Sequence, residues 1–263
     1  MKIPLSGCQV YAYTGSRSID RRQPTVVFLH GAANDHSVWT LQSRYFAHHG
    51  YNVLAPDLPG HGLSGGQPLA SIGEIADWTR RLLDELGIAN VVLVGHSMGS
   101  LAALEAAARE PSRVQRLAML GAAVPMQVSD ALLAAAHDDE ALAHALIVGW
   151  SFSAPSQLGG NTQPGLWMIG NGLRLLQRSA PGVLHTDLRA CHDYSGGLDA
   201  AIRVTCPALL IAGGADVMAP KRRTRAVAER LAQVRVVDVP DCGHSMMSEA
   251  PDAVLDALRE FLG

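Results

Sequence analysis

The chain alternates between short apolar runs and longer segments in which apolar residues recur every three or four positions. The short runs are rich in β-branched residues and apolar at nearly every position, as is typical of strands buried on both faces of a sheet. They lie at residues 24–30, 51–57, 90–95, 114–123, 207–214 and 234–240. The segments with helical spacing lie at residues 37–50, 71–87, 98–110, 220–233 and 250–262. This order predicts an α/β fold, with a mostly parallel central sheet and helices on both faces.

Residues 125–195 interrupt the alternation. They contain no convincing strand pattern, and instead hold two or three helical segments joined by a polar loop rich in glycine and proline. A structureless loop of that length is uncommon inside a compact domain. We therefore expect a helical insertion here and a core domain formed by residues 1–124 and 196–263. The alternative is that this segment continues the alternation, with strands that its pattern does not reveal.

Composition narrows the function classes. The chain has 263 residues, 48% of them hydrophobic and 17% charged, and a net charge of −3, which gives no electrostatic reason to expect nucleic acid or an anionic membrane as a partner. Its four cysteines are far apart and form no cluster, so neither a disulfide framework nor a metal site is expected. The first residues have no signal-peptide pattern, and no apolar run is long enough to span a membrane. These features predict a soluble cytoplasmic protein and leave its oligomeric state open.

The stretch VVLVGHSMGS places Ser97 between Gly95 and Gly99, directly after an expected strand and before an expected helix. A strand that turns at once into a helix strains the residue at the turn, and side chains at positions 95 and 99 would collide with neighbouring elements. An ordinary helix N-cap would explain the serine but not both glycines. The pattern therefore predicts that Ser97 is a nucleophile.

A serine hydroxyl needs a base, and that base needs an acid to orient it. Asp216 follows the expected strand 207–214, and His244 lies in a glycine-containing loop after the last expected strand. Both therefore lie at carboxyl ends of strands, where open α/β sheets build their sites. His96 adjoins the serine and Asp241 precedes His244, but we expect structural roles for these two residues.

Five stretches of this chain, taken together, resemble the α/β-hydrolase superfamily: FLHGAANDHSVW, DLPGHGLS, GHSMGS, GGADVMAP and GHSMMSEAPDAV. The resemblance covers the chain outside the insertion. It implies a triad of Ser97, Asp216 and His244, in that chain order, and an enzyme without a cofactor. It also implies an oxyanion hole formed by the backbone N–H group of Met98 and that of Ala32 or Ala33, of which we favour Ala32. The insertion would then be a helical cap (lid) that shapes the substrate pocket.

The nucleophile type limits the reaction. Haloalkane dehalogenases and epoxide hydrolases of this superfamily carry aspartate at the position of Ser97, so serine indicates acyl transfer through an acyl-enzyme. Hydrolysis of a small carboxylic ester is the first expectation. Carbon–carbon bond hydrolysis, enol-lactone hydrolysis, thioester hydrolysis and peracid chemistry use the same triad, although the loop GAAND differs from the GGGPG-like loop usual in carbon–carbon hydrolases. A ligand receptor that keeps the triad is a further alternative.

The apolar residues of the insertion predict a hydrophobic substrate. Some of these residues must simply pack the insertion onto the core, so the sequence does not show which of them reach the substrate. As pocket residues we expect Trp150, Trp167, Met168 and His192.

Overall fold

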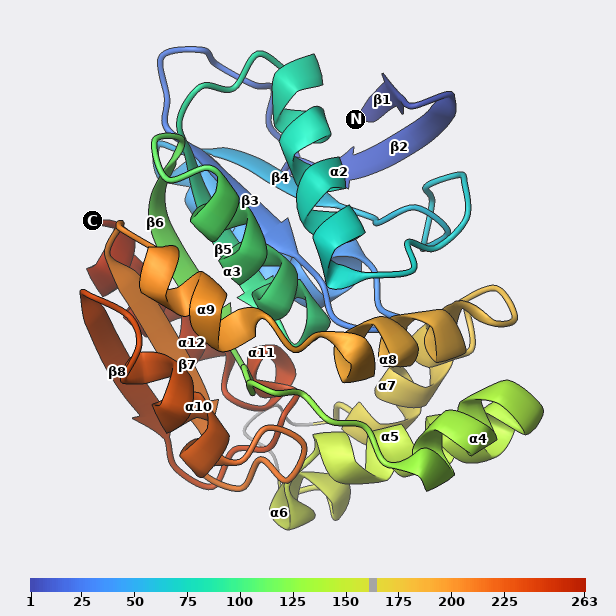
Figure 1. Ribbon diagram of the computed structural model, residues 1–263. Helices are drawn as coiled ribbons and strands as arrows, with labels where there is room; N and C mark the ends of the chain where they lie inside the picture. Colours follow the sequence, from blue (N-terminus) through green and yellow to red (C-terminus); the bar gives the residue numbers. More distant parts are fainter. Residues whose placement is uncertain (161–164) are drawn as a thin grey trace.

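The computed structural model describes residues 1–160 and 165–263, which fold around one eight-stranded sheet with strand order β1-β2-β4-β3-β5-β6-β7-β8 (Figure 1). Strand β1 pairs with β2 and β2 pairs with β4 in the antiparallel direction, whereas β4, β3, β5, β6, β7 and β8 run parallel. The strands are β1 (Lys2–Leu5), β2 (Cys8–Tyr13), β3 (Thr25–Leu29), β4 (Asn52–Pro56), β5 (Val91–His96), β6 (Val114–Leu120), β7 (Ala208–Gly213) and β8 (Val234–Val239). The α/β fold expected from the sequence is confirmed.

Helices cover both faces of this sheet, as the buried strands require. Figure 1 shows α2, α3 and α9 in front of the sheet and α12 behind it. One face carries α2 (Ile72–Glu85), α3 (Met98–Arg109), α9 (Gly197–Arg203) and α10 (Lys221–Ala228), and the other carries α1 (Thr40–His48) and α12 (Pro251–Leu262). A 3-10 turn, η1 (His36–Trp39), precedes α1, and the short α11 (Met246–Glu249) precedes α12.

The period-two alternation of side chains divides the core into two layers. Val27 and Leu29 of β3 pack with α2 and α3, whereas Val26 and Phe28 of the same strand pack with α1 and α12. All four side chains are fully buried. Since β3 lies between β4 and β5, this packing holds the carboxyl ends of the central strands in fixed register.

The first two strands were not expected from the sequence. They form a tight hairpin in which Leu5 pairs with Cys8, and the two turn residues Ser6 and Gly7 both have positive φ, 51° and 79°. This is the conformation that a two-residue hairpin turn requires. The hairpin lies at the edge of the sheet and several of its side chains are exposed, so its apolar pattern is weaker than that of the central strands.

Between β6 and β7 the chain leaves the sheet and forms the α4–α8 segment, which gathers below the carboxyl ends of the strands in Figure 1. The expectation of two or three helices here was wrong, because the described residues form five: α4 (Asp130–Asp138), α5 (Glu140–Ser151), α6 (Ala154–Gln157), α7 (Met168–Leu176) and α8 (Val183–Asp193). Their buried side chains form a cluster that meets the core at Ala33. No helix in the described part of the chain is both long and apolar enough to cross a membrane.

Candidate active site

Ser97 lies at the turn between β5 and α3 with φ 53° and ψ −119°, a conformation that costs free energy for a residue with a side chain. Its side chain makes no capping hydrogen bond to the helix, so the ordinary N-cap explanation of this serine does not hold. A Cβ atom at Gly95 would overlap the backbone of Gly99, and one at Gly99 would overlap the carbonyl of Leu29. The two glycines are therefore required by the close approach of α3 to the strands around it.

His244 and Asp216 meet beside this turn, although they are 28 positions apart in sequence. His244 Nδ1 lies 2.8 Å from Asp216 Oδ2, and both side chains are buried. Because a carboxylate can only accept, the proton is on Nδ1 and the lone pair is on Nε2. The Nε2 atom is buried without a hydrogen-bond partner among the described residues, so it is free to accept a proton.

The Asp216 carboxylate is prepared for this contact by its own loop. Burial alone would raise the pKa of Asp216, but the charge and hydrogen bond of His244 and two backbone donors lower it below its ordinary value. The donors are the N–H groups of Met218 and Ala219, which reach Asp216 Oδ1 at 2.9 and 2.8 Å. Asp216 is therefore ionised at neutral pH and presents its second oxygen to His244.

His96 has a different role from His244. Its Nε2–H donates to the backbone carbonyl of His244 at 2.9 Å, and burial together with the nearby His244 ring lowers the pKa of His96 to about 3. A permanently neutral His96 therefore holds the backbone that carries His244. Gly121 leaves room for the His244 ring, since a Cβ there would lie 2.9 Å from His244 Cε1.

A second anchor of the His244 loop is Glu249, which sequence reasoning missed. Its carboxylate accepts from the N–H of Gly243 at 2.9 Å, and from the N–H and hydroxyl of Ser153 at 3.0 and 2.6 Å. The loop is also tied to α5, because Ser245 N–H donates to the carbonyl of Ser151 at 2.9 Å. The His244 loop and the α5–α6 junction are thus held together.

The two expected oxyanion donors are positioned near Ser97. Met98 is the first residue of α3, where backbone N–H groups have no acceptor within the helix and the helix dipole is positive. Ala32 follows Gly31, whose Cβ position would lie 3.3 Å from Ser97 Cβ. The loop after β3 therefore passes directly over the serine.

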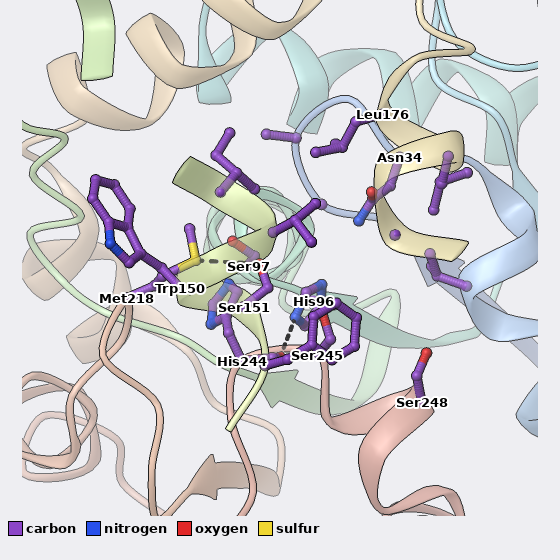
Figure 2. A pocket seen from close by; sticks show the side chains of 18 of the residues that line it. Asn34, His96, Ser97, Trp150, Ser151, Leu176, Met218, His244, Ser245 and Ser248 are labelled. Atoms are coloured by element: carbon purple, nitrogen blue, oxygen red, sulfur yellow. Dashed lines mark hydrogen bonds between the residues drawn. The ribbon is translucent and has the colours of Figure 1, made fainter. Parts of the chain in front are cut away.

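A cavity of about 790 Å³ opens above Ser97 and His244, between the carboxyl ends of the strands and the α4–α8 segment. Figure 2 shows both side chains in its wall, between Asn34 and Trp150. Much of the wall is apolar, with Val38, Leu132, Ile147, Val148, Phe152, Leu176, Leu188 and Met247. Four arginines also reach it: Arg174, Arg178, Arg222 and Arg223.

Of the four expected pocket residues, Trp150 and Met168 line this cavity. Trp167 and His192 are not among the described residues that line it. Trp167 is 72% exposed and lies against Gly170, and His192 Nδ1–H donates to the carbonyl of Val128 at 2.9 Å. Composition identified candidates, but the tertiary packing of the α4–α8 segment decides which of them line the cavity.

One group of side chains has the composition of a cation site. Ligand atoms of Asp35, His36 and Asp57 lie within 4.8 Å of one another. The Asp57 carboxylate, however, already accepts from the backbone N–H and Nδ1–H of His36 and from the N–H of Leu63, at 2.7 to 2.8 Å. Asp35 Oδ1 caps the η1 turn through the N–H of Ser37 at 2.8 Å. These contacts make the group an anchor of the loops that follow β3 and β4.

The fold agrees with the comparisons to known proteins. Residues 26–257 match the model of the alpha/beta hydrolase family, and the chain belongs to this family. The solved enol-lactonase from Burkholderia xenovorans LB400 has the same fold, with a TM-score of 0.87 and 22% sequence identity over 100% of this chain and 99% of that one.

Two relatives are similar in sequence to most of this chain. The pimeloyl-[acyl-carrier protein] methyl ester esterase of Aromatoleum aromaticum is 31% identical, over 88% of this chain and 94% of that protein. Protein ABHD8 of Bos taurus is 27% identical over 89% of this chain but only 55% of its own length. The chain thus spans about half the length of the ABHD8 relatives that it matches.

The close approach at the turn predicts opposite effects for two helical glycines. Gly99→Ala should lower the free energy of unfolding by about 1–3 kcal/mol or more, because the added methyl group overlaps the β3 backbone. Gly149→Ala in α5 is the control, since a Cβ there meets nothing within 4 Å, and it should raise that free energy by about 0.5–1 kcal/mol. Urea unfolding followed by circular dichroism measures both values. Equal effects would show that the approach at Gly99 is not tight.

Proposed function

We propose that this protein hydrolyses a small carboxylic ester with a hydrophobic acyl or alcohol group, through an acyl-enzyme formed on Ser97. The observation that carries the proposal is the His244–Asp216 pair, which leaves a buried, unpartnered Nε2 lone pair beside a serine held at a strained turn. An imidazole held by a carboxylate, with its other nitrogen free, supports a role as the general base that activates a nearby serine hydroxyl.

The proposed reaction begins when a substrate enters the cavity with its carbonyl carbon next to Ser97 Oγ. His244 Nε2 takes the hydroxyl proton as Oγ attacks, and the negative charge that forms on the carbonyl oxygen is stabilised by the N–H groups of Met98 and Ala32. Asp216 stabilises the imidazolium, which then returns its proton to the leaving alcohol. Water, activated by the same histidine, releases the acid from Ser97.

The α4–α8 segment acts as a cap in this proposal. It supplies much of the apolar wall, including Trp150 and Met168, and this favours a hydrophobic group near the serine. The methyl ester esterase of Aromatoleum aromaticum, which is similar to this chain, supports ester chemistry. The alternative reactions, on lactones, thioesters, peracids or vinylogous diketones, would use the same residues and differ in the substrate that the cavity accepts.

The identity of the nucleophile is tested by labelling. A fluorophosphonate probe should modify the wild-type protein at one position, and Ser97→Ala should abolish both the modification and the hydrolysis of p-nitrophenyl esters. Mass spectrometry of the labelled peptides locates the modified residue. Labelling that persists in Ser97→Ala would exclude Ser97 as the nucleophile.

The acid is tested by a pair of matched substitutions. Asp216→Asn should leave the fold intact but favour the wrong tautomer of His244, and the corresponding change in a serine protease lowers kcat about 10⁴-fold. Asp241→Asn is the control, because Asp241 is exposed and has a φ of 55°, which asparagine tolerates well. Steady-state kinetics on one p-nitrophenyl ester compares them. A larger loss in Asp241→Asn would reassign the acid.

The cap is tested by its two tryptophans. Trp150→Ala should change the ratio of kcat/KM between short and long acyl esters, since Trp150 lines the cavity and one methylene-sized change in a pocket alters binding by about 1–3 kcal/mol. Trp167→Ala should leave this ratio unchanged, because the Trp167 side chain is mostly exposed outside the cavity. A chain-length series of p-nitrophenyl esters provides the ratio. A profile that shifts only in Trp167→Ala would contradict this assignment.

A further inference from the structure

The loop after β3 is held by residues of the α4–α8 segment, far away in sequence. Ala33 directly follows the proposed oxyanion donor Ala32, is 1% exposed and has a φ of 52°, which a residue with a side chain rarely adopts. Its N–H donates to Asp187 Oδ2 at 2.8 Å, and its carbonyl accepts from the hydroxyl of Ser179 at 2.9 Å. Both polar backbone groups of this strained residue are therefore bound by side chains of the segment between β6 and β7.

Asp187 is itself held by a histidine of another loop. Its Oδ2 atom also lies 2.7 Å from His61 Nε2, and both side chains are 1% exposed. His61 Nδ1 lies 2.9 Å from the carbonyl of Pro59. Because a carbonyl and a carboxylate can only accept, both nitrogens of His61 carry protons and the contact with Asp187 is a buried ion pair.

The electrostatics of the pair agree with this assignment. Burial lowers the pKa of His61, but the charge and hydrogen bond of Asp187, the carbonyl of Pro59 and the charge of Asp57 raise it, and the net direction is upward. Asp187 is therefore not an isolated buried charge, which would be strongly unfavourable. It can serve as a rigid, charged acceptor for the Ala33 N–H group.

The Gly31–Ala32 peptide, which precedes the contact between Ala33 and Asp187, is held by His30. His30 Nδ1–H donates to the carbonyl of Gly31 at 2.9 Å, and His30 Nε2 accepts from the N–H of Leu58 at 3.0 Å. Burial and the charge of His61 lower the pKa of His30 to about 4, so His30 stays neutral and keeps this pattern. Since a trans peptide is planar, fixing the Gly31 carbonyl directs the Ala32 N–H to the opposite side.

We propose that Asp187, charged and braced by His61, is a positioning residue that holds the Ala32–Ala33 peptide and so keeps the Ala32 N–H directed at the oxyanion. The inference rests on the proposed function, because Ala32 is an oxyanion donor only in that reaction. It gives the α4–α8 segment a second role besides substrate selection: packing of α8 against the loop after β3 completes the site that stabilises the transition state.

The test compares three variants of α8 in the whole 263-residue chain. Asp187→Ala removes the acceptor, and kcat should fall about 10²-fold with KM within about twofold of the wild-type value, since only the transition state carries the oxyanion. Asp187→Asn keeps an amide oxygen for the Ala33 N–H, so it should recover at least about tenfold of that loss. Val183→Ala is the control, because Val183 is a buried residue of the same helix whose apolar side chain cannot accept a hydrogen bond from Ala33, and it should keep the wild-type kcat.

A boronic acid inhibitor provides the second readout. Its adduct with Ser97 places an oxygen where the oxyanion forms, so its inhibition constant in Asp187→Ala should rise by the same factor as kcat/KM falls. A residue that only stabilises the fold would lower the melting temperature without this parallel change. If Asp187→Ala does not fold, Ser179→Ala tests the same loop from its other contact and should lower kcat at unchanged KM.

The outcomes distinguish failure of the positioning role from failure of the proposed function. If the wild-type protein hydrolyses esters at Ser97 but Asp187→Ala and Ser179→Ala keep both kcat and boronate affinity, the positioning role is overturned and the proposed function stands. A rise in KM at constant kcat would likewise overturn it, since that result indicates substrate binding. If the wild-type protein neither turns over esters nor reacts with fluorophosphonate at Ser97, the proposed function fails and the positioning role fails with it.

Discussion

The close approach of α3 to the strands around it is the constraint on which the rest of the site depends. Because Gly95 and Gly99 carry no side chain, a single residue, Ser97, can separate β5 from α3, and this residue is left at the apex with a positive φ. The strain at this residue is balanced by a core in which every side chain of β3 and β5 is buried. A looser turn would let the serine relax into an ordinary helix N-terminus, without a fixed position relative to the neighbouring strand ends.

The buried histidines around this turn have different roles, because each imidazole ring has different hydrogen-bond partners. His244 faces a carboxylate and keeps a free lone pair, whereas His96 faces a carbonyl and remains neutral. His61 faces both a carbonyl and a carboxylate and is therefore charged. The residue type is the same in each case, and the acceptors supplied by the fold determine whether the ring is suited to take a proton, to hold a backbone or to carry a buried charge.

The segment between β6 and β7 is hydrogen-bonded to the loops of the candidate site in two places. Ser153 and Ser151 bind the loop that carries His244, and Asp187 binds the loop that carries Ala32. The walls of the cavity and the supports of the reactive groups are thus built partly from the same helices. Substitutions in this segment are expected to affect chemistry as well as substrate choice, and the residue contacted decides which effect dominates.

Local sequence determined the fold class and the core of the candidate site. Continuous apolar runs marked the parallel strands, although β8 at the sheet edge is mostly exposed rather than buried, and glycine spacing around Ser97 marked the turn, because both patterns report the immediate environment of a few consecutive residues. Asp216 and His244 could be named as well, since each lies in a loop that follows a recognisable strand.

Only the tertiary structure decided the remaining features. The first hairpin lies at an edge where the apolar pattern is weak, and the packing of the α4–α8 segment decides which of its side chains line the cavity, with Trp167 and His192 not among the described lining residues. Asp187 offered no signal, since it joins Ala33 across 154 positions, and such a contact exists only once the chain has folded.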